Sequence, residues 1–288
     1  MANWPELWLR KQGGVLPSRY VAIDLETSGF SLDDYVVNIA HIQVNDGKIE
    51  HMMSVFIDWR QVPGANLNRL RTGLERVRRD LSGYDITWEK LCEVGMPAQK
   101  VFQAYHDIFT SLMKRGYYIA GHNSYRFDEP RLAKAMAHLQ IAPNFSFTDK
   151  LIDSQALEIA SRESNESAVQ FLPSDTMRTW CTRLVNHGNK FKAHKLMEHL
   201  VPKYDLVINE DKAHEADVGA RAVHLLMEHF RAVCNNRANP LHASQWRTDV
   251  AASMQGNPVP PPGIPIKPIS KGVVLQQPLR RMRGQRSN

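Results

Sequence analysis

Apolar residues recur along most of the chain with two different periods, and together these periods predict an α/β fold. Runs of apolar and β-branched residues bounded by turn residues indicate strands at residues 20–25, 36–44 and 49–58. The gaps between these runs are short and predict hairpins, so the first three strands should be antiparallel. A segment with helical spacing at 98–115 ends at Gly116 and leads into a fourth, short strand at 117–120.

Helices dominate the pattern after the fourth strand. Helical spacing is predicted at residues 129–139, 150–160, 176–186 and 213–233, and the polar stretch 161–167 is expected to be an exposed insertion. Strands followed by alternating helices and strands indicate a mixed sheet flanked by helices. The sequence has no internal repeat and neither of the glycine-rich phosphate-loop patterns, which argues against nucleotide binding by such a loop.

A change in composition towards the end of the chain predicts three regions. We expect an N-terminal extension at 1–18, one globular domain at 19–238 and a disordered, proline-rich basic tail at 239–288. Seven of the 16 prolines lie between 258 and 278, where they oppose helix and central strand alike. From residue 250 onward there are six basic residues and no acidic ones, so the net charge of +6 arises in the tail. It therefore says nothing about the partners of the globular domain.

Cysteine usage and hydropathy predict where the protein works. The three cysteines, Cys92, Cys181 and Cys234, form no CxxC pair, which argues against both a disulfide framework and a cysteine zinc knuckle. No apolar run approaches the length of a membrane span, and the first ten residues lack the continuous apolar core of a signal peptide. We expect a soluble protein of the reducing cytoplasm, without a membrane partner.

The first predicted strand carries two carboxylates on one face. Val21, Ile23 and Leu25 point to one side, so Asp24 and Glu26 share the other side. Two adjacent carboxylates repel each other, and a divalent cation between them relieves that repulsion. Taken alone, the same pair is more typical of a turn cap or of an ion pair with a lysine than of a metal site.

Two later segments add acidic residues at predicted helix starts. A strand ending near Gly121 is followed by Asp128 in the first turn of the next helix, where it is also a plausible N-terminal cap. Residues 213–223 open a second apolar helix, and its first turns carry His214 and Asp217.

Together these segments resemble the DEDD family of 3′-to-5′ exonucleases, in its histidine-containing (DEDDh, DnaQ-like) branch with a ribonuclease H-like fold. Residues 24–29 (DLETSG) are similar to the family's D-x-E-T-T/S-G motif. Residues 86–95 resemble its I-T…L…G segment, and residues 151–154 (LIDS) resemble a D-T element after the second motif. The resemblance spans about residues 20–230 and is carried by the order of several motifs.

The resemblance implies a metal-dependent hydrolase. By this resemblance, two Mg²⁺ or Mn²⁺ ions would be held by four carboxylates, those of Asp24, Glu26, Asp128 and Asp217. Asp24 would bridge the two ions, and His214 would take the proton of the attacking water. The implied reaction releases nucleoside 5′-monophosphates from single-stranded DNA or RNA, as in repair or replication. Contacts to the terminal nucleotide would come from Thr27, Ser28, Phe30 and Asn123.

One departure concerns the fourth carboxylate. The family usually reads H-x-x-x-x-D, whereas five residues after His214 this chain has Gly219. A two-residue deletion would make Asp217 the ligand, since its helical face is shared with Arg221 and His214 could lean over the same site. An ungapped match instead leaves the ligand missing and predicts a weak or silent nucleic-acid-binding relative.

Two basic regions have open roles. The arginines at 69, 71, 76, 78 and 79 either hold phosphates of a single strand outside the site or form a solvated helix face. The arginines at 280–286 either tether nucleic acid or bind a protein partner. The second reading would make the chain an accessory subunit of a replication or repair complex.

Overall fold

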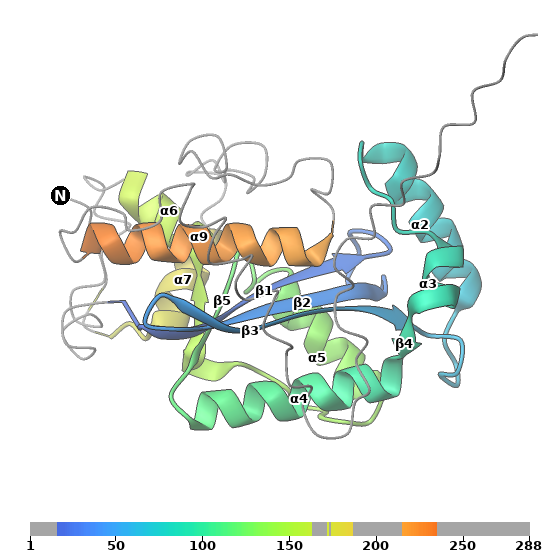
Figure 1. Cartoon of the computed structure of the whole chain (residues 1–288), viewed down its shortest axis with the longest axis horizontal. Helices are drawn as coiled ribbons and strands as arrows, with labels where there is room; N and C mark the ends of the chain where they lie inside the picture. Colours follow the sequence, from blue (N-terminus) through green and yellow to red (C-terminus); the bar gives the residue numbers. More distant parts are fainter. Residues whose placement is uncertain (1–15, 163–171, 173, 187–214, 235–288) are drawn as a thin grey trace, which may run out of the picture.

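A six-stranded mixed sheet forms the centre of the molecule (Figure 1). The computed structural model describes residues 16–162, 172, 174–186 and 215–234. The spatial order of the strands is β4-β3-β2-β1-β5-β6, and their bounds are β1 (Arg19–Thr27), β2 (Val36–Asn45), β3 (Lys48–Asp58), β4 (Met96–Pro97), β5 (Tyr118–Gly121) and β6 (Leu151–Asp153). β1 and β2 are antiparallel, as are β2 and β3, whereas β5 runs parallel to β1 and β6 parallel to β5. The predicted mixed sheet, with antiparallel strands followed by parallel ones, is confirmed.

The hairpin between β2 and β3 turns on two residues with left-handed backbone. Asp46 and Gly47 have φ of +52° and +80°. Two consecutive positive φ angles are what a two-residue turn needs to match the twist of its flanking strands, and Asp-Gly adopts them at low cost. This turn therefore sets Asn45 opposite Lys48 at the start of the β2–β3 pairing.

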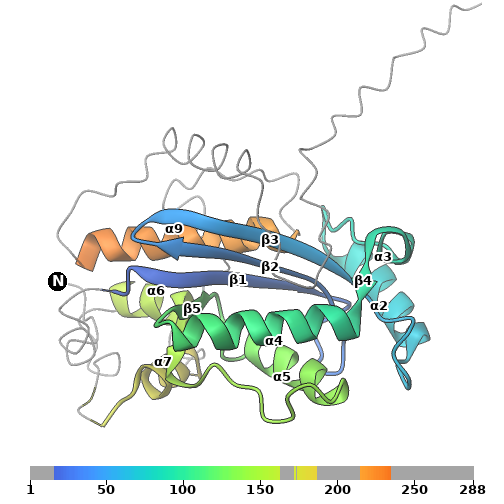
Figure 2. The same ribbon diagram turned by 60° about the horizontal axis from the view of Figure 1, so that its bottom comes forward.

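Helices cover both faces of the sheet (Figures 1 and 2). α4 (Ala98–Lys114) and α5 (Asp128–His138) lie on one face, and α4 buries Phe102, Tyr105 and Phe109 there. α9 (Ala216–Cys234) lies along β1 and β2 on the opposite face, with Ala220 and Val223 fully buried. Because β1 is an interior strand covered on both sides, its residues 20–23 are fully buried, and the residues that follow them lie where the strand leaves the core.

Two helices lie where β1 ends: the first was offered by the sequence only as one of two interpretations of the arginines at 69–79, and the second was not predicted. α2 (Leu67–Asp80) and α3 (Trp88–Val94) cap that end of the sheet (Figure 1). Asn66 caps α2 by accepting a hydrogen bond from the Arg69 amide, and Thr87 caps α3 in the same way through Lys90. α2 buries only four residues of 14, so its apolar stripe is too narrow to stand out from the surrounding arginines.

The predicted helix at 150–160 is wrong at its start. Leu151 and Ile152 are fully buried in β6, which pairs with β5, and helix α6 (Ser154–Arg162) begins only after them. The short 3₁₀ helix η1 (Thr148–Lys150) precedes β6, and α7 (Met177–Asn186) follows α6.

The predicted terminal extension and tail lie largely outside the described residues, as do positions 163–167 of the predicted insertion. Within the described part of the chain, no helix is long and apolar enough to cross a membrane.

Candidate active site

The first two carboxylates lie near the C-terminal end of β1. Asp24 and Glu26 are partly accessible to solvent, while Ile23 and Leu25, which alternate with them along the strand, are buried. Parallel pairing of Ala22 with Ala120 brings the ends of β1 and β5 to the same edge. The segment that follows β5 is therefore carried towards Asp24, as the sequence predicted.

Asp128 is the first residue of α5 and is buried, with 2% of its surface exposed. The Ser124 hydroxyl donates a hydrogen bond to its carboxylate. Gly121 leaves the room for this arrangement, because a β-carbon there would collide with Ser124. The turn between β5 and α5 thus fixes the position of Asp128 before any ligand binds.

Asp153, at the end of β6, shapes this turn from the neighbouring strand. Its buried carboxylate accepts backbone hydrogen bonds from Asn123 at 2.9 Å, Tyr125 at 3.3 Å and Gln155 at 3.0 Å. Burial raises the pKa of Asp153 to about 6, and those backbone donors oppose the rise. Asn123 itself has a φ of +60°, so its backbone is held in the left-handed region. The sequence offered only the D-T-like element as a signal for this role.

Burial first, and then neighbouring carboxylates, raise the pKa of all three acidic side chains. Desolvation and then repulsion by Glu26 and Asp128 hold the pKa of Asp24 well above its usual range. The pKa of Glu26 is also raised, by desolvation first and then by Asp128 and Asp85. Burial raises the pKa of Asp128 to about 7, against the hydrogen bond from Ser124. Repulsion of Asp24 by Glu26 and Asp128, and of Glu26 by Asp128, places the three side chains within electrostatic reach of one another.

The structure disfavours the two ordinary explanations for the DxE pair. Among the described residues, no Lys or Arg forms an ion pair with Asp24 or Glu26. The turn after β1 is stabilised by other side chains: the Thr27 hydroxyl donates to the Gly29 carbonyl at 2.6 Å, and the Ser28 hydroxyl accepts from the Tyr35 amide at 3.0 Å. Within the described residues, neither a turn cap nor an ion pair therefore accounts for the two carboxylates.

α9 approaches Asp24 through a glycine. A β-carbon at Gly219 would collide with the Asp24 carboxylate, so the helix backbone packs directly against it. Asp217 also raises the pKa of Asp24, but less than desolvation, Glu26 and Asp128 do. Its carboxylate lies 3.2 Å from the guanidinium of Arg221, one turn along α9. Position 219 therefore faces Asp24 most directly, and Asp217 lies nearby in an ion pair.

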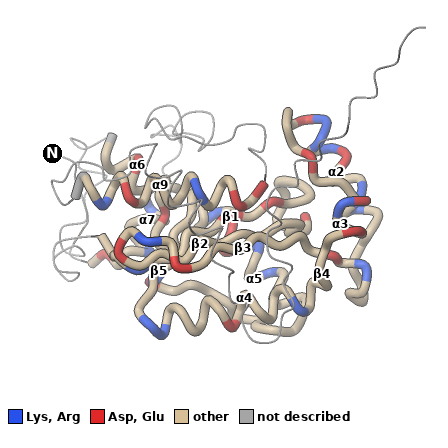
Figure 3. The backbone as a smooth tube through the Cα atoms, in the orientation of Figure 1, with Lys and Arg blue, Asp and Glu red and all other residues tan. Residues whose placement is uncertain are grey.

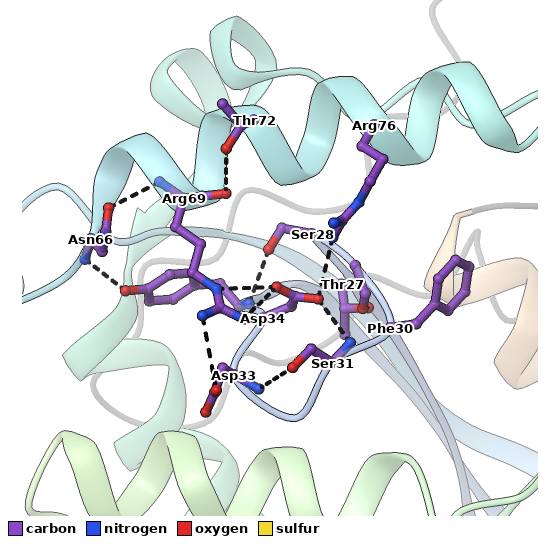
Figure 4. A network of polar contacts seen from close by, with 12 residues as sticks. Thr27, Ser28, Phe30, Ser31, Asp33, Asp34, Asn66, Arg69, Thr72 and Arg76 are labelled. Carbon is purple, nitrogen blue, oxygen red and sulfur yellow. Dashed lines mark hydrogen bonds and ion pairs between the residues drawn. The ribbon is translucent and has the colours of Figure 1, made fainter.

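The other predicted site residues have different surroundings. His214 lies outside the described residues. Thr27 and Ser28 are buried in the turn after β1, whereas 65% of Phe30 is exposed and its side chain points away from the neighbouring ion pairs (Figure 4). Asn123 lies in the turn that leads to Asp128.

α2 holds the loop after β1 in place (Figure 4). The buried Asp34 carboxylate lies 3.2 Å from Arg69 and 3.7 Å from Arg76. Gly73 packs against the Ser28 carbonyl, where a β-carbon would collide. Two of the five predicted phosphate-binding arginines thus stabilise the fold. Along α2 and α3, basic and acidic residues are mixed (Figure 3).

The connection between α2 and α3 adds two residues that the sequence did not reveal. The Tyr84 hydroxyl donates to the Thr27 carbonyl at 2.9 Å. Asp85 follows it and raises the pKa of Glu26. Nothing in the local pattern marks this turn, because its role depends on where α2 and α3 pack.

The donor chemistry of the cluster fits a hard divalent cation. Mg²⁺ and Mn²⁺ prefer carboxylate oxygens, and a cation would relieve the repulsion described above. In the described residues, however, no group of three or more His, Cys, Asp or Glu side chains already converges as a metal centre. A cation bound here would have to draw the carboxylates together.

Comparisons with known proteins give the fold. No protein-family model and no curated protein sequence matches this chain. Among solved structures, E. coli exonuclease I bound to single-stranded DNA matches with a TM-score of 0.51 and 15% identity over 75% of this chain and 41% of that one. Its complex with a dT13 oligonucleotide gives 0.50 and 15%, over 75% and 42%. This chain therefore spans less than half the length of these neighbours, and it shares their ribonuclease H-like fold over the matched part.

The raised pKa values predict that the metal-free protein loses stability as the pH rises. A carboxyl group with a raised pKa in the folded state stabilises that state below its unfolded pKa of about 4, and the contribution disappears as the pH passes the folded pKa. With a chelator present, the free energy of unfolding should fall by a few kcal/mol between pH 5 and pH 8. Asp128→Asn should flatten this dependence, measured by urea unfolding.

Asp80→Asn, at the exposed end of α2, is the matched control and should retain the wild-type slope. An equal slope in Asp128→Asn and wild type would contradict the assignment of a raised pKa to Asp128.

Gly219→Ala is predicted to destabilise the protein, although alanine is normally the better helix former. The added methyl group must displace Asp24 or α9, at a cost of about 1–3 kcal/mol. In an Asp24→Ala background, the same substitution should become neutral or stabilising, because the colliding carboxylate is gone. Urea unfolding of the wild-type protein, the two single variants and the double variant measures this coupling. Additive changes in the free energy of unfolding would show that Gly219 and Asp24 do not contact each other.

Proposed function

We propose that this chain is a metal-dependent 3′-to-5′ exonuclease that hydrolyses the terminal phosphodiester of single-stranded DNA or RNA and releases nucleoside 5′-monophosphates. The observation that carries the proposal is the group of carboxylates with raised pKa, Asp24, Glu26 and Asp128, of which Asp24 and Glu26 form no ion pair with a Lys or Arg among the described residues. The fold and the motif order support it. The neighbours' single-stranded DNA ligands support the substrate class.

The residues that would hold divalent cations are Asp24, Glu26 and Asp128, with Asp217 as the fourth candidate. When bound at such a site, Mg²⁺ or Mn²⁺ activates a water molecule and stabilises the charge that develops on the departing oxygen. Asp24 and Glu26 are reachable from solvent, whereas Asp128 is enclosed. A cation would therefore enter from the side of β1.

The chain's own side chains have distinct proposed tasks. His214 would accept the proton of the attacking water at a ring nitrogen, since a histidine is substantially neutral at working pH. Phe30 is exposed beside the loop after β1, and aromatic faces stack on bases without sequence preference. Thr27 and Ser28 would act chiefly by fixing that loop, because both are buried and hydrogen-bonded within it.

Asp24→Asn is predicted to reduce release of mononucleotides from a 5′-labelled single-stranded oligonucleotide by at least about 10²-fold, because it removes the central charge of the cluster. The rate of release is measured by incubating each protein with DNA and RNA oligomers in the presence of Mn²⁺ and separating the products. Asp46→Asn, in the exposed β2–β3 turn, is the control. Equal rates for Asp24→Asn and wild type would refute the proposed site.

A second candidate function is that of a weak or catalytically silent nucleic-acid-binding relative. Two observations favour it: Gly219 faces Asp24 at the position where the family's spacing places an aspartate, and Asp217 is paired with Arg221. Such a protein would keep the ribonuclease H-like fold and bind a single strand without releasing nucleotides.

Asp217→Ala separates the two candidates. If Asp217 is the fourth ligand, this variant should lose mononucleotide release by at least about 10²-fold while still binding the oligonucleotide. Release and binding are measured on the same labelled strand. Binding without release by the wild-type protein would establish the silent relative instead.

A further inference from the structure

The start of α9 is tied to the sheet by a buried asparagine. Asn38 lies in β2 and is fully buried. Its Oδ1 accepts a hydrogen bond from the Ala216 amide at 2.9 Å, and its Nδ2 donates to Ser54 Oγ at 3.1 Å and to the Val55 carbonyl at 2.9 Å. Since the first amides of a helix have no partner within it, this side chain acts as a cap supplied from another element.

A lysine on α3 ties the same helix start from a second direction. The Lys90 ammonium lies 3.1 Å from Asp85 Oδ2 and 3.6 Å from Glu215 Oε1. It also lies over the Phe56 ring, 4.5 Å from its centroid. Lys90 therefore links β3, the connection between α2 and α3, and the residue that immediately precedes α9.

Both of these interactions involve residues next to Glu26. Asn38 is the partner of Glu26 across the β1–β2 pairing. Asp85, held by Lys90, raises the pKa of Glu26. At the start of α9, the Glu215 carbonyl accepts hydrogen bonds from the Val218 amide at 2.9 Å and the Gly219 amide at 3.3 Å. The first turn of α9 is thus built on residues that Asn38 and Lys90 hold.

The position of this turn matters because α9 meets Asp24 through its backbone. Gly219 has no room for a β-carbon against the Asp24 carboxylate, so a small displacement of the turn changes that contact directly. Asp217 lies in the same turn and influences Asp24 electrostatically. A helix start that frayed would move both residues.

We propose that Asn38 and Lys90 are positioning residues that fix the first turn of α9, and thereby hold Asp217 and the Gly219 backbone beside Asp24. The catalytic meaning of this inference rests on the proposed exonuclease function, whereas the structural tie does not. Neither side chain is required to touch the nucleic acid.

Hydrogen exchange tests the tie without depending on activity. Asn38→Ala and Lys90→Met should each accelerate exchange of the Ala216, Val218 and Gly219 amides by about fivefold, the effect of losing one net hydrogen bond or ion pair. Lys90→Arg should restore slow exchange, since it keeps a cation between Asp85 and Glu215. Where the protein releases mononucleotides, kcat should fall with KM nearly unchanged, and Lys90→Arg should recover kcat.

Two matched controls separate positioning from general loss of structure. Ser54→Ala removes another partner of Asn38 but leaves the Ala216 bond intact, and Lys150→Met removes a lysine that lies over Tyr118. Both should leave exchange in α9 at the wild-type rate. Unchanged exchange in both Asn38→Ala and Lys90→Met, or equal acceleration in the controls, would overturn the inference. If the wild-type protein released no mononucleotide, the exonuclease proposal would fail. Hydrogen exchange would still test whether Asn38 and Lys90 hold the first turn of α9.

Discussion

Electrostatic repulsion among desolvated carboxylates at the end of β1 is the constraint on which the account of this molecule depends. Asp24, Glu26 and Asp128 are brought together by an interior strand and by the turn after its parallel neighbour; burial raises the pKa of all three, and Glu26 and Asp128 add repulsion at Asp24. A folded protein does not gain stability from such an arrangement at neutral pH. The energetic cost is understandable if the cluster binds cations, because the attraction to a divalent ion then offsets the repulsion.

The surroundings of the cluster are organised to hold it in place. Asp153 and Ser124 fix the turn that presents Asp128, while Asp34 and two arginines of α2 fix the loop after β1. Gly219 allows α9 to pack its backbone against Asp24, and Asn38 and Lys90 tie the start of that helix. These supports come from segments that lie far apart in the sequence. They fix the positions of the carboxylates, and among the described residues no Lys or Arg forms an ion pair with Asp24 or Glu26.

Much of this arrangement could be predicted from sequence, where local pattern decides the outcome. Alternation in β1 placed Asp24 and Glu26 on one face, and the end of an apolar run placed Asp128 at the start of a helix. The roles of Asp85 and Arg69 could not be predicted, because they depend on how α2 and α3 pack against the loop after β1. The missing aspartate at position 219 was visible as a departure in spacing. Only the structure shows that the residue there faces Asp24.

The most direct test of the central claim is a titration of the chelator-treated protein with Mn²⁺, followed by electron paramagnetic resonance at pH 8 and pH 5. Because the pKa of Asp128 is about 7 and those of Asp24 and Glu26 are raised, protons and the metal ion should compete for the same oxygens. The account predicts Mn²⁺ binding at pH 8 that weakens strongly at pH 5 and is lost in Asp24→Asn. Absence of binding at pH 8, or binding that is unaffected by both pH and this substitution, would contradict it.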